Sequence, residues 1–243
     1  MLTPVFSYLV VCMAGLVVAA DAVSAAAPIR IMPFGDSITG SPGCWRALLW
    51  RKLQTAGFTA NTTFVGTLPG PDCGFAYGGG ANEGHGGFLA SGIVANNQLP
   101  GWLAKTHPDI VMMHLGTNDV WSNEPPATIT ANFSVLVQQM RASKPSMRIL
   151  VAQILAMAPT RPANCPDCPT RVVAFNKAIA AWVEDQNKNT KDDAAAIPLT
   201  LVDCWTGFDD ATDTIDGVHP NSAGNAKMAA SWYGPLVAAI EAS

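Results

Sequence analysis

The sequence predicts an α/β fold in which a parallel sheet is flanked by helices. Short apolar runs alternate along the chain with longer segments that carry apolar residues on one face. Strands separated by helices of this length form right-handed βαβ units, and therefore a parallel sheet. We expect strands at residues 29–34, 63–67, 110–115, 149–155 and 199–203, and helices at 44–55, 91–105, 127–143, 170–186 and 222–242.

The strands are predicted from apolar runs, two of which end in polar, turn-forming residues. Residues 29–34 run into Gly-Asp-Ser, and residues 110–115 hold five apolar residues and a histidine before Gly-Thr-Asn-Asp. A continuous apolar run is typical of a strand that is covered on both faces of a parallel sheet. Open α/β sheets bind ligands beyond the carboxyl ends of their strands. The polar residues that follow these two strands are therefore the first candidates for a functional site.

The helices are predicted from their apolar spacing. Phe133, Leu136, Val137 and Met140 recur at intervals of three and four, so they share one helix face and indicate packing against a core. Between the second strand and the second helix lies a segment rich in glycine and proline, residues 68–87. We expect this segment to line the functional site rather than to be a disordered linker.

The first 26 residues have the pattern of a secretory signal peptide. An apolar run from Val5 to Ala20 is followed by small-residue cleavage sites at residues 20–22 and 24–26, although no Lys or Arg lies near Met1. A membrane anchor is the alternative, but the run is short of the roughly 20 residues that span a bilayer. We expect residues 27–243 to form a single domain that is secreted and extracellular.

The charge of the chain argues against two classes of partner. The net charge is −4, only 13% of the residues are charged, and no basic patch occurs. Nucleic acids and anionic membrane surfaces are therefore not expected partners once the signal is removed. We expect a monomer. Asn61 and Asn132 begin N-glycosylation sequons.

Five cysteines remain after the signal peptide, so a secreted chain is expected to hold disulfides and one odd thiol. We favour a bridge between Cys44, which follows the first strand, and Cys73, in the loop after the second. Cys165 and Cys168 either pair with each other or send one member to Cys204.

Ser37 and His219 are the most informative residues, because with Asp216 they supply a nucleophile, a base and an orienting acid. Ser37 follows an apolar strand, where a hydroxyl reaches the carboxyl edge of the sheet. Asp216 and His219 are three residues apart, so one turn can hold the imidazole by one nitrogen and leave the other free. Alternatively, Gly-Asp-Ser is an ordinary turn, and His219 is a helix-start residue before Pro220.

Asn118 stands in the polar loop after the strand at 110–115. Acyl transfer needs donors aimed at a developing oxyanion, and an asparagine amide can be one of them. The alternative is that Asn118 and Asp119 cap the following helix. The segment Asn82-Glu83-Gly84-His85-Gly86-Gly87-Phe88 could bring backbone N–H groups close to a ligand, or it is a flexible loop.

These four segments, in this order, resemble those of the SGNH (GDS-type) hydrolases, which are named for Ser, Gly, Asn and His in successive blocks. The matching residues are Ser37, Gly87 with Gly86 as the fallback, Asn118 and His219. The resemblance implies a flavodoxin-like three-layer α/β/α sandwich with a central parallel sheet of five strands. The Gly-x-Ser-x-Gly elbow of the α/β-hydrolases is absent.

The resemblance also implies a role for each residue. Ser37 would be the nucleophile, His219 the base and Asp216 its orienting acid. The N–H groups of Ser37 and Gly87 and the side chain of Asn118 would form the oxyanion hole. Neither a cofactor nor a metal is expected.

Three segments more specifically resemble the acetylxylan esterases of carbohydrate esterase family 3, namely residues 31–39, 83–88 and 214–221. Those relatives commonly carry Trp where Phe88 stands. The resemblance implies a secreted serine esterase that acts on acetylated plant cell-wall polysaccharide. The alternatives are an esterase on other acetylated glycans or on lipids and, less favoured because the triad and hole residues are present, a non-catalytic carbohydrate-binding protein.

Further residues near these segments are candidates for other roles. Trp121 and Asp36 are candidate substrate contacts, since an indole stacks on a pyranose face, although Trp121 can equally be a packing residue. His85 and His114 are expected to be structural. His114 lies inside a predicted buried strand, where its ring needs a hydrogen-bond partner.

Overall fold

A computed structural model describes Met1 and residues 27–41, 43–70, 73–74, 77, 80–159, 165–189 and 197–243. The expected signal peptide, apart from Met1, lies outside the described residues. Among the helices that are described, none is both long and apolar enough to cross a membrane.

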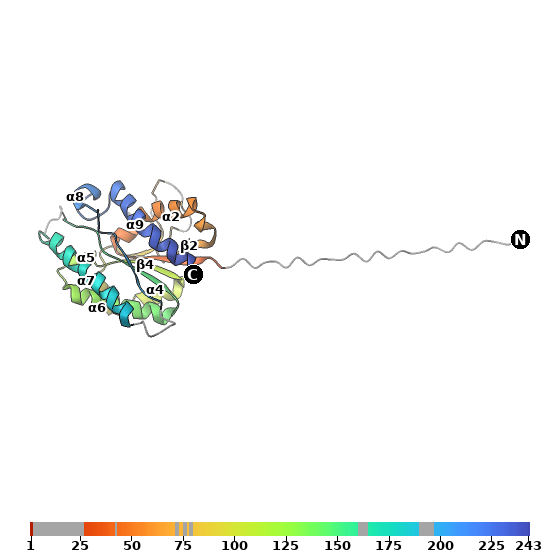
Figure 1. Ribbon diagram of the computed structural model, residues 1–243, viewed down its shortest axis with the longest axis horizontal. Helices are drawn as coiled ribbons and strands as arrows, with labels where there is room; N and C mark the ends of the chain where they lie inside the picture. The colour runs from red at the N-terminus through yellow and green to blue at the C-terminus, as the bar shows by residue number, and fades with distance from the viewer. Residues whose placement is uncertain are drawn as a thin grey trace.

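A parallel sheet forms the middle of the domain (Figure 1). Each neighbouring pair in it is parallel. Counted in chain order, its five main strands lie in the order 2-1-3-4-5, which is the flavodoxin-like arrangement. The predicted fold is therefore confirmed. The strands, in spatial order, are β2 (Thr62–Phe64), β1 (Ile29–Gly35), β4 (Ile110–His114), β5 (Arg148–Ala152) and β6 (Thr200–Val202).

Helices cover both faces of the sheet (Figure 1). On one face α2 (Trp45–Thr55) packs against α9 (Ser222–Glu241). The other face carries α3 (Ala90–Ala95), α4 (Leu99–Thr106), α5 (Thr117–Trp121), α6 (Pro126–Ser143) and α7 (Cys168–Asn189). All five residues of β4 are buried, as expected for a strand covered on both sides. Shorter elements are α1 (Ser37–Gly40), η1 (Phe58–Asn61) and α8 (Asp210–Asp213).

Besides the short elements α1, η1 and α8, which were not expected, two elements differ from the sequence expectation. The helix predicted at residues 91–105 is two helices, α3 and α4, separated at Asn96–Gln98. Pro100 lies in the first turn of α4, where its missing N–H costs nothing, whereas inside a continuous helix it would break a hydrogen bond. A short strand, β3 (Glu83–Gly84), is not signalled by any apolar run, but it pairs with Phe34 and Gly35 of β1.

The disulfides follow the expected pattern. Cys44 is bonded to Cys73, as predicted, and this bridge ties the segment at residue 73 to the start of α2. Of the two options for the other pair, the structure shows Cys165 bonded to Cys168. Cys204 carries a free, buried thiol.

Candidate active site

Ser37 begins α1, directly beyond the carboxyl end of β1. The chain passes very close to β4 here, because a Cβ atom on Gly35 would lie 2.0 Å from the carbonyl oxygen of His114. Only glycine allows this approach. Asp36 caps the short helix, since its side chain accepts a hydrogen bond of 3.0 Å from the N–H of Ile38. The strand and the cap together fix the position of the Ser37 hydroxyl.

Ser37 and His219 are 182 residues apart in sequence and hydrogen-bonded in the structure. Ser37 Oγ lies 2.9 Å from His219 Nε2, and His219 Nδ1 lies 2.8 Å from Asp216 Oδ2. The other carboxylate oxygen of Asp216 accepts from the N–H groups of Val218 and His219, at 3.0 and 2.8 Å. The structure thus brings together the three residues that the sequence nominates for a nucleophile, a base and an orienting acid.

The turn that holds Asp216 and His219 depends on Gly217. Its φ is +84°, and a Cβ atom at this position would lie 1.9 Å from the carbonyl oxygen of Ala158. The N–H of Ala158 in turn donates to the carbonyl of Gly217 at 2.9 Å. The turn is therefore pinned to the segment that follows β5, and a side chain at residue 217 would displace it.

The electrostatics favour an ionised Asp216. Partial burial raises the pKa of Asp216, but the hydrogen bonds from the backbone and ring of His219 outweigh this effect, and the pKa lies below its ordinary value. An ionised carboxylate accepts the Nδ1–H of His219. That tautomer leaves Nε2 with a lone pair for the proton of Ser37.

Asp36, which precedes Ser37, lies in the interior of the protein rather than at the surface. It is fully buried, and burial raises its pKa to about 6, although the hydrogen bond from the Ile38 N–H opposes this. A carboxyl group with no exposed surface does not reach a substrate. We therefore correct the expectation that Asp36 contacts substrate and assign it to the support of the Ser37 turn.

Asn118 is held by the glycine-rich segment. Its Nδ2 donates to the carbonyl of Phe88 at 3.0 Å, which uses one of the two amide hydrogens and leaves the other for a ligand. Of the two candidate glycines, Gly86 borders Ser37, because a Cβ atom on it would lie 3.7 Å from Ser37 Cβ. Gly87 has a positive φ of +79° and open space around it. The oxyanion role of Gly87 stays a prediction.

A pocket of about 160 Å³ adjoins Ser37. Its lining consists of Ser37, Gly40, Ser41, Leu68, Pro69, Asn82, Gly84 and Gly86. The segment at residues 68–87, expected from its composition to line the site, supplies five of these eight residues. The walls are small and mostly uncharged, which suits a small uncharged group next to Ser37.

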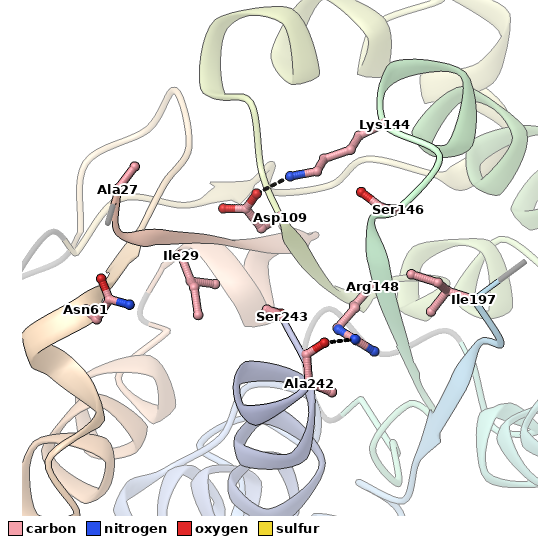
Figure 2. Close-up of a pocket in the computed structure, with 10 residues that line it drawn as sticks. All are labelled: Ala27, Ile29, Asn61, Asp109, Lys144, Ser146, Arg148, Ile197, Ala242 and Ser243. Atoms are coloured by element: carbon pink, nitrogen blue, oxygen red, sulfur yellow. Dashed lines mark hydrogen bonds and ion pairs between the residues drawn. The ribbon is translucent and has the colours of Figure 1, made fainter. Parts of the chain in front are cut away.

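A larger pocket, of about 360 Å³, lies at the opposite edge of the sheet (Figure 2). Its residues include Ile29, Asp109 and Arg148, which stand at the amino ends of β1, β4 and β5. In Figure 2 the cations of this pocket already have partners, since Lys144 pairs with Asp109 and Arg148 donates to the carbonyl of Ala242. Ser37 is at the carboxyl edge, so this larger pocket is not the candidate active site.

One supporting residue, Arg46, has no clear signal in the sequence. Arg46 looks like a surface residue of a helix, yet it is fully buried and donates to the carbonyls of Thr39, Gly40 and Gly80 at 2.7, 3.0 and 2.7 Å. It therefore ties α1 to the loop beside the pocket. His114 is also fully buried, and burial lowers its pKa to about 4, so its ring is neutral.

Two other candidates from the sequence, Trp121 and His114, form no hydrogen bond with Ser37 or His219 in the described part of the chain. Trp121 is partly buried and packs against the core, so its contact with substrate stays a prediction. The ring nitrogens of His114 have no hydrogen-bond partner among the residues that the structure describes, contrary to the expectation for a buried histidine. Across the same residues, no group of three or more His, Cys, Asp or Glu is arranged to hold a metal ion.

Comparison with known families identifies the class of protein. Residues 34–227 match the GDSL-like Lipase/Acylhydrolase family, and the chain belongs to it. The domain is thus a carboxylic ester hydrolase of the SGNH type, as its fold and the four sequence segments indicate.

Individual esterases and carbohydrate esterases are similar to this chain over most of its length. The chain is 31% identical to a carbohydrate esterase family 3 protein from Talaromyces cellulolyticus, with a TM-score of 0.76 over 88% of this chain and 99% of that one. An acetyl esterase mutant crystallised with acetate ion is also 31% identical, with a TM-score of 0.75 and the same coverage. A multidomain esterase from Ruminococcus flavefaciens is 28% identical over 90% of this chain. The chain spans 30% of the length of that relative.

Proposed function

We propose that this protein is a secreted serine esterase that removes acetyl groups from plant cell-wall polysaccharide, with acetylxylan as the substrate. The observation that carries the proposal is the hydrogen-bonded series Ser37 Oγ, His219 Nε2, His219 Nδ1 and Asp216 Oδ2, with separations of 2.9 and 2.8 Å. A hydroxyl, an imidazole and a carboxylate in this order form the activated nucleophile of acyl transfer.

The proposed reaction has two steps. Ser37 Oγ attacks the acetyl carbonyl carbon while His219 Nε2 takes the serine proton, and a tetrahedral intermediate forms. His219 then gives this proton to the sugar oxygen as the C–O bond breaks, which leaves an acetyl-enzyme. Water attacks the acetyl carbonyl while His219 takes one of its protons. His219 then returns this proton to Ser37 Oγ as the bond between Oγ and the acetyl carbon breaks, which yields acetic acid that ionises to acetate.

Charge on the carbonyl oxygen would be stabilised by donors around Ser37. The free amide hydrogen of Asn118 is the first, since the other is committed to Phe88. The N–H of Ser37 and an N–H of the Gly86–Gly87 segment complete the proposed oxyanion hole. Such donors act most strongly on charge that develops in the transition state.

The acetyl group and the polysaccharide are supported by the relatives and by the pocket. An acetyl esterase and a family 3 carbohydrate esterase are each 31% identical and align with nearly their whole chains. The pocket of about 160 Å³ beside Ser37 has small walls, which suits a short acyl group. Secretion is supported by the two disulfides.

The test is release of acetate from acetylated xylan, acetylated pectin and a triglyceride, measured side by side with the same enzyme preparation. We expect the fastest release from acetylated xylan, and no release by the Ser37→Ala variant. Faster release from pectin or triglyceride would contradict the substrate and leave the esterase chemistry intact. Absence of release from all three, and from a small activated acetyl ester, would contradict the function itself.

A further inference from the structure

A second histidine–carboxylate pair stands behind the glycine segment beside Ser37. Glu83 is fully buried, and its carboxylate accepts from the N–H and the hydroxyl of Thr67 at 2.8 and 2.7 Å. Its Oε1 also lies 2.7 Å from His85 Nε2. Because the carboxylate accepts, Nε2 carries the shared hydrogen, which fixes the tautomer and the tilt of the His85 ring.

Aromatic rings hold both sides of this imidazole. His85 stacks on Trp102 of α4, with ring centroids 4.2 Å apart and planes inclined by 13°. It also stacks on Phe88, at 4.9 Å and 22°. The side chain of His85 is only 15% exposed. With Glu83 at its edge, the ring is constrained in orientation as well as in position.

The backbone around this ring forms the turn that approaches Ser37. The N–H of Phe88 donates to the carbonyl of His85 at 3.2 Å, so Gly86 and Gly87 are the two central residues. The positive φ of Gly87, +79°, is what a type II turn requires at its third position. The N–H of His85 donates to the carbonyl of Gly35 at 2.9 Å, which anchors the turn to the strand that carries the nucleophile.

The same turn also controls Asn118. The carbonyl of Phe88 accepts a hydrogen bond of 3.0 Å from the Asn118 amide. Phe88, whose ring stacks on His85, therefore orients the side chain of Asn118. A rotation of His85 would therefore shift the N–H groups of the Gly86–Gly87 turn and the Asn118 amide together. Hydrogen-bond donors of an oxyanion hole act only when they are held at about 2.7–3.1 Å from the developing charge.

We propose that Glu83 and His85 are positioning residues that hold the Gly86–Gly87 turn and the Asn118 amide in the geometry of the oxyanion hole. The inference rests on the proposed function and adds to it the two residues that position the donors of the oxyanion hole. It differs from a packing role, because packing alone would affect folding stability and not the turnover of folded enzyme.

The experiment compares Glu83→Gln and His85→Phe with wild type on p-nitrophenyl acetate. His85→Phe removes the Glu83–His85 bond and keeps a stacked ring. Glu83→Gln removes the charge and one of the two oxygens that accept from Thr67 and His85. We expect kcat to fall by about 10- to 100-fold with KM within about threefold, since the lost interaction serves the transition state. Phosphonylation of Ser37 by a p-nitrophenyl phosphonate, followed by mass spectrometry, should slow in parallel. Glu124→Gln, a half-exposed glutamate, is the matched control and should equal wild type.

The double variant Glu83→Gln/His85→Phe separates positioning from stability. Removing the carboxylate together with its partner should restore the melting temperature relative to His85→Phe alone, because no buried charge is left unpaired. We expect kcat to stay low. Wild-type kcat in the folded single variants, or recovery of kcat together with melting temperature in the double variant, would overturn the proposal. An inactive wild type would instead count against the proposed function, and phosphonylation would still test the positioning.

Discussion

The Ser37 hydroxyl stands at the first position of a four-residue helix and contributes little to the core, so it can be removed without loss of the fold. We expect Ser37→Ala to lower kcat/KM on p-nitrophenyl acetate by several orders of magnitude, as removal of a triad serine does. Ser41→Ala, at an exposed serine of the same pocket, is the matched control and should remain active. Retention of more than about a tenth of wild-type turnover by Ser37→Ala would exclude Ser37 as the nucleophile.

Asp216 orients His219 and is not itself a proton acceptor in the proposed reaction, so its loss should cost less than the loss of His219. We expect His219→Ala to be the least active variant. Asp216→Asn should be less active than Asp216→Ala, because the amide can present an N–H to the ring and favour the wrong tautomer. The measurement is kcat/KM on one acetyl ester, with circular dichroism as the check on folding. Wild-type activity in both Asp216 variants would mean that another group orients the imidazole.

Asn118 has one amide hydrogen bonded to the carbonyl of Phe88 and the other available to a ligand, which we propose is the oxyanion. We expect Asn118→Ala to lower kcat by about 10²- to 10³-fold with little change in KM, because the bond strengthens in the transition state. Asn96→Ala, at an exposed asparagine whose side chain bonds within its own helix, is the control. A large rise in KM with kcat intact would instead make Asn118 a residue that binds the ground state.

At the scale of elements, α1 is capped by a carboxylate that is costly to ionise. The pKa of Asp36 is raised from 3.8 to about 6 by burial, so between these pH values the folded protein holds a proton that the unfolded chain has lost. Stability due to this group is therefore present below about pH 4 and is lost as the pH rises through 6. The difference in pKa corresponds to a change of about 3 kcal/mol in the free energy of unfolding.

The variant Asp36→Asn tests this linkage, because asparagine does not titrate and can still accept from the N–H of Ile38. We expect the variant to gain stability relative to wild type as the pH is raised from 4 to 7. Urea unfolding at several pH values measures the gain, and Asp185→Asn, on the exposed side of α7, should show none. A gain that is constant with pH would mean that Asp36 is ionised throughout this range.

The short strand β3 and the turn after it illustrate how an element can be set by contacts rather than by its own residues. Glu83 and Gly84 have no strand-like apolar pattern, and they form β3 only by pairing with the end of β1. The following turn is held by Thr67, Trp102 and Asn118, which come from three other parts of the chain. The shape of this turn, and with it the geometry of the proposed oxyanion hole, therefore depends on the assembled domain.

At the scale of the whole molecule, the two disulfides and the buried thiol predict how many cysteines react with a thiol reagent. Burial raises the pKa of the Cys204 thiol above its ordinary value, so the native protein should not react with Ellman's reagent. Denatured, unreduced mature protein should release one equivalent, and the Cys204→Ser variant none. Peptide mapping should recover Cys44 linked to Cys73. Five reactive thiols would contradict an oxidising compartment.

The sequence by itself determined the fold class and the residues that meet at the site. Apolar runs and helical stripes are local properties, so five parallel strands between helices could be predicted without any contact information. Ser37, Asn118 and His219 could be nominated because each follows or flanks such an element at a spacing with a chemical meaning. The Cys44–Cys73 bridge could be predicted from the expected loops.

Only the tertiary structure decided which partner each remaining group takes. Cys165 pairs with Cys168 and leaves Cys204 buried, a choice that depends on where three segments come to lie. The burial of Asp36, and the bond between Glu83 and His85, likewise have no local signal, because charged residues are ordinarily at the surface. The physical reason is the same in each case. Burial and hydrogen bonding depend on residues far away in the sequence, whereas secondary structure and motif spacing depend on residues that are close together in the sequence.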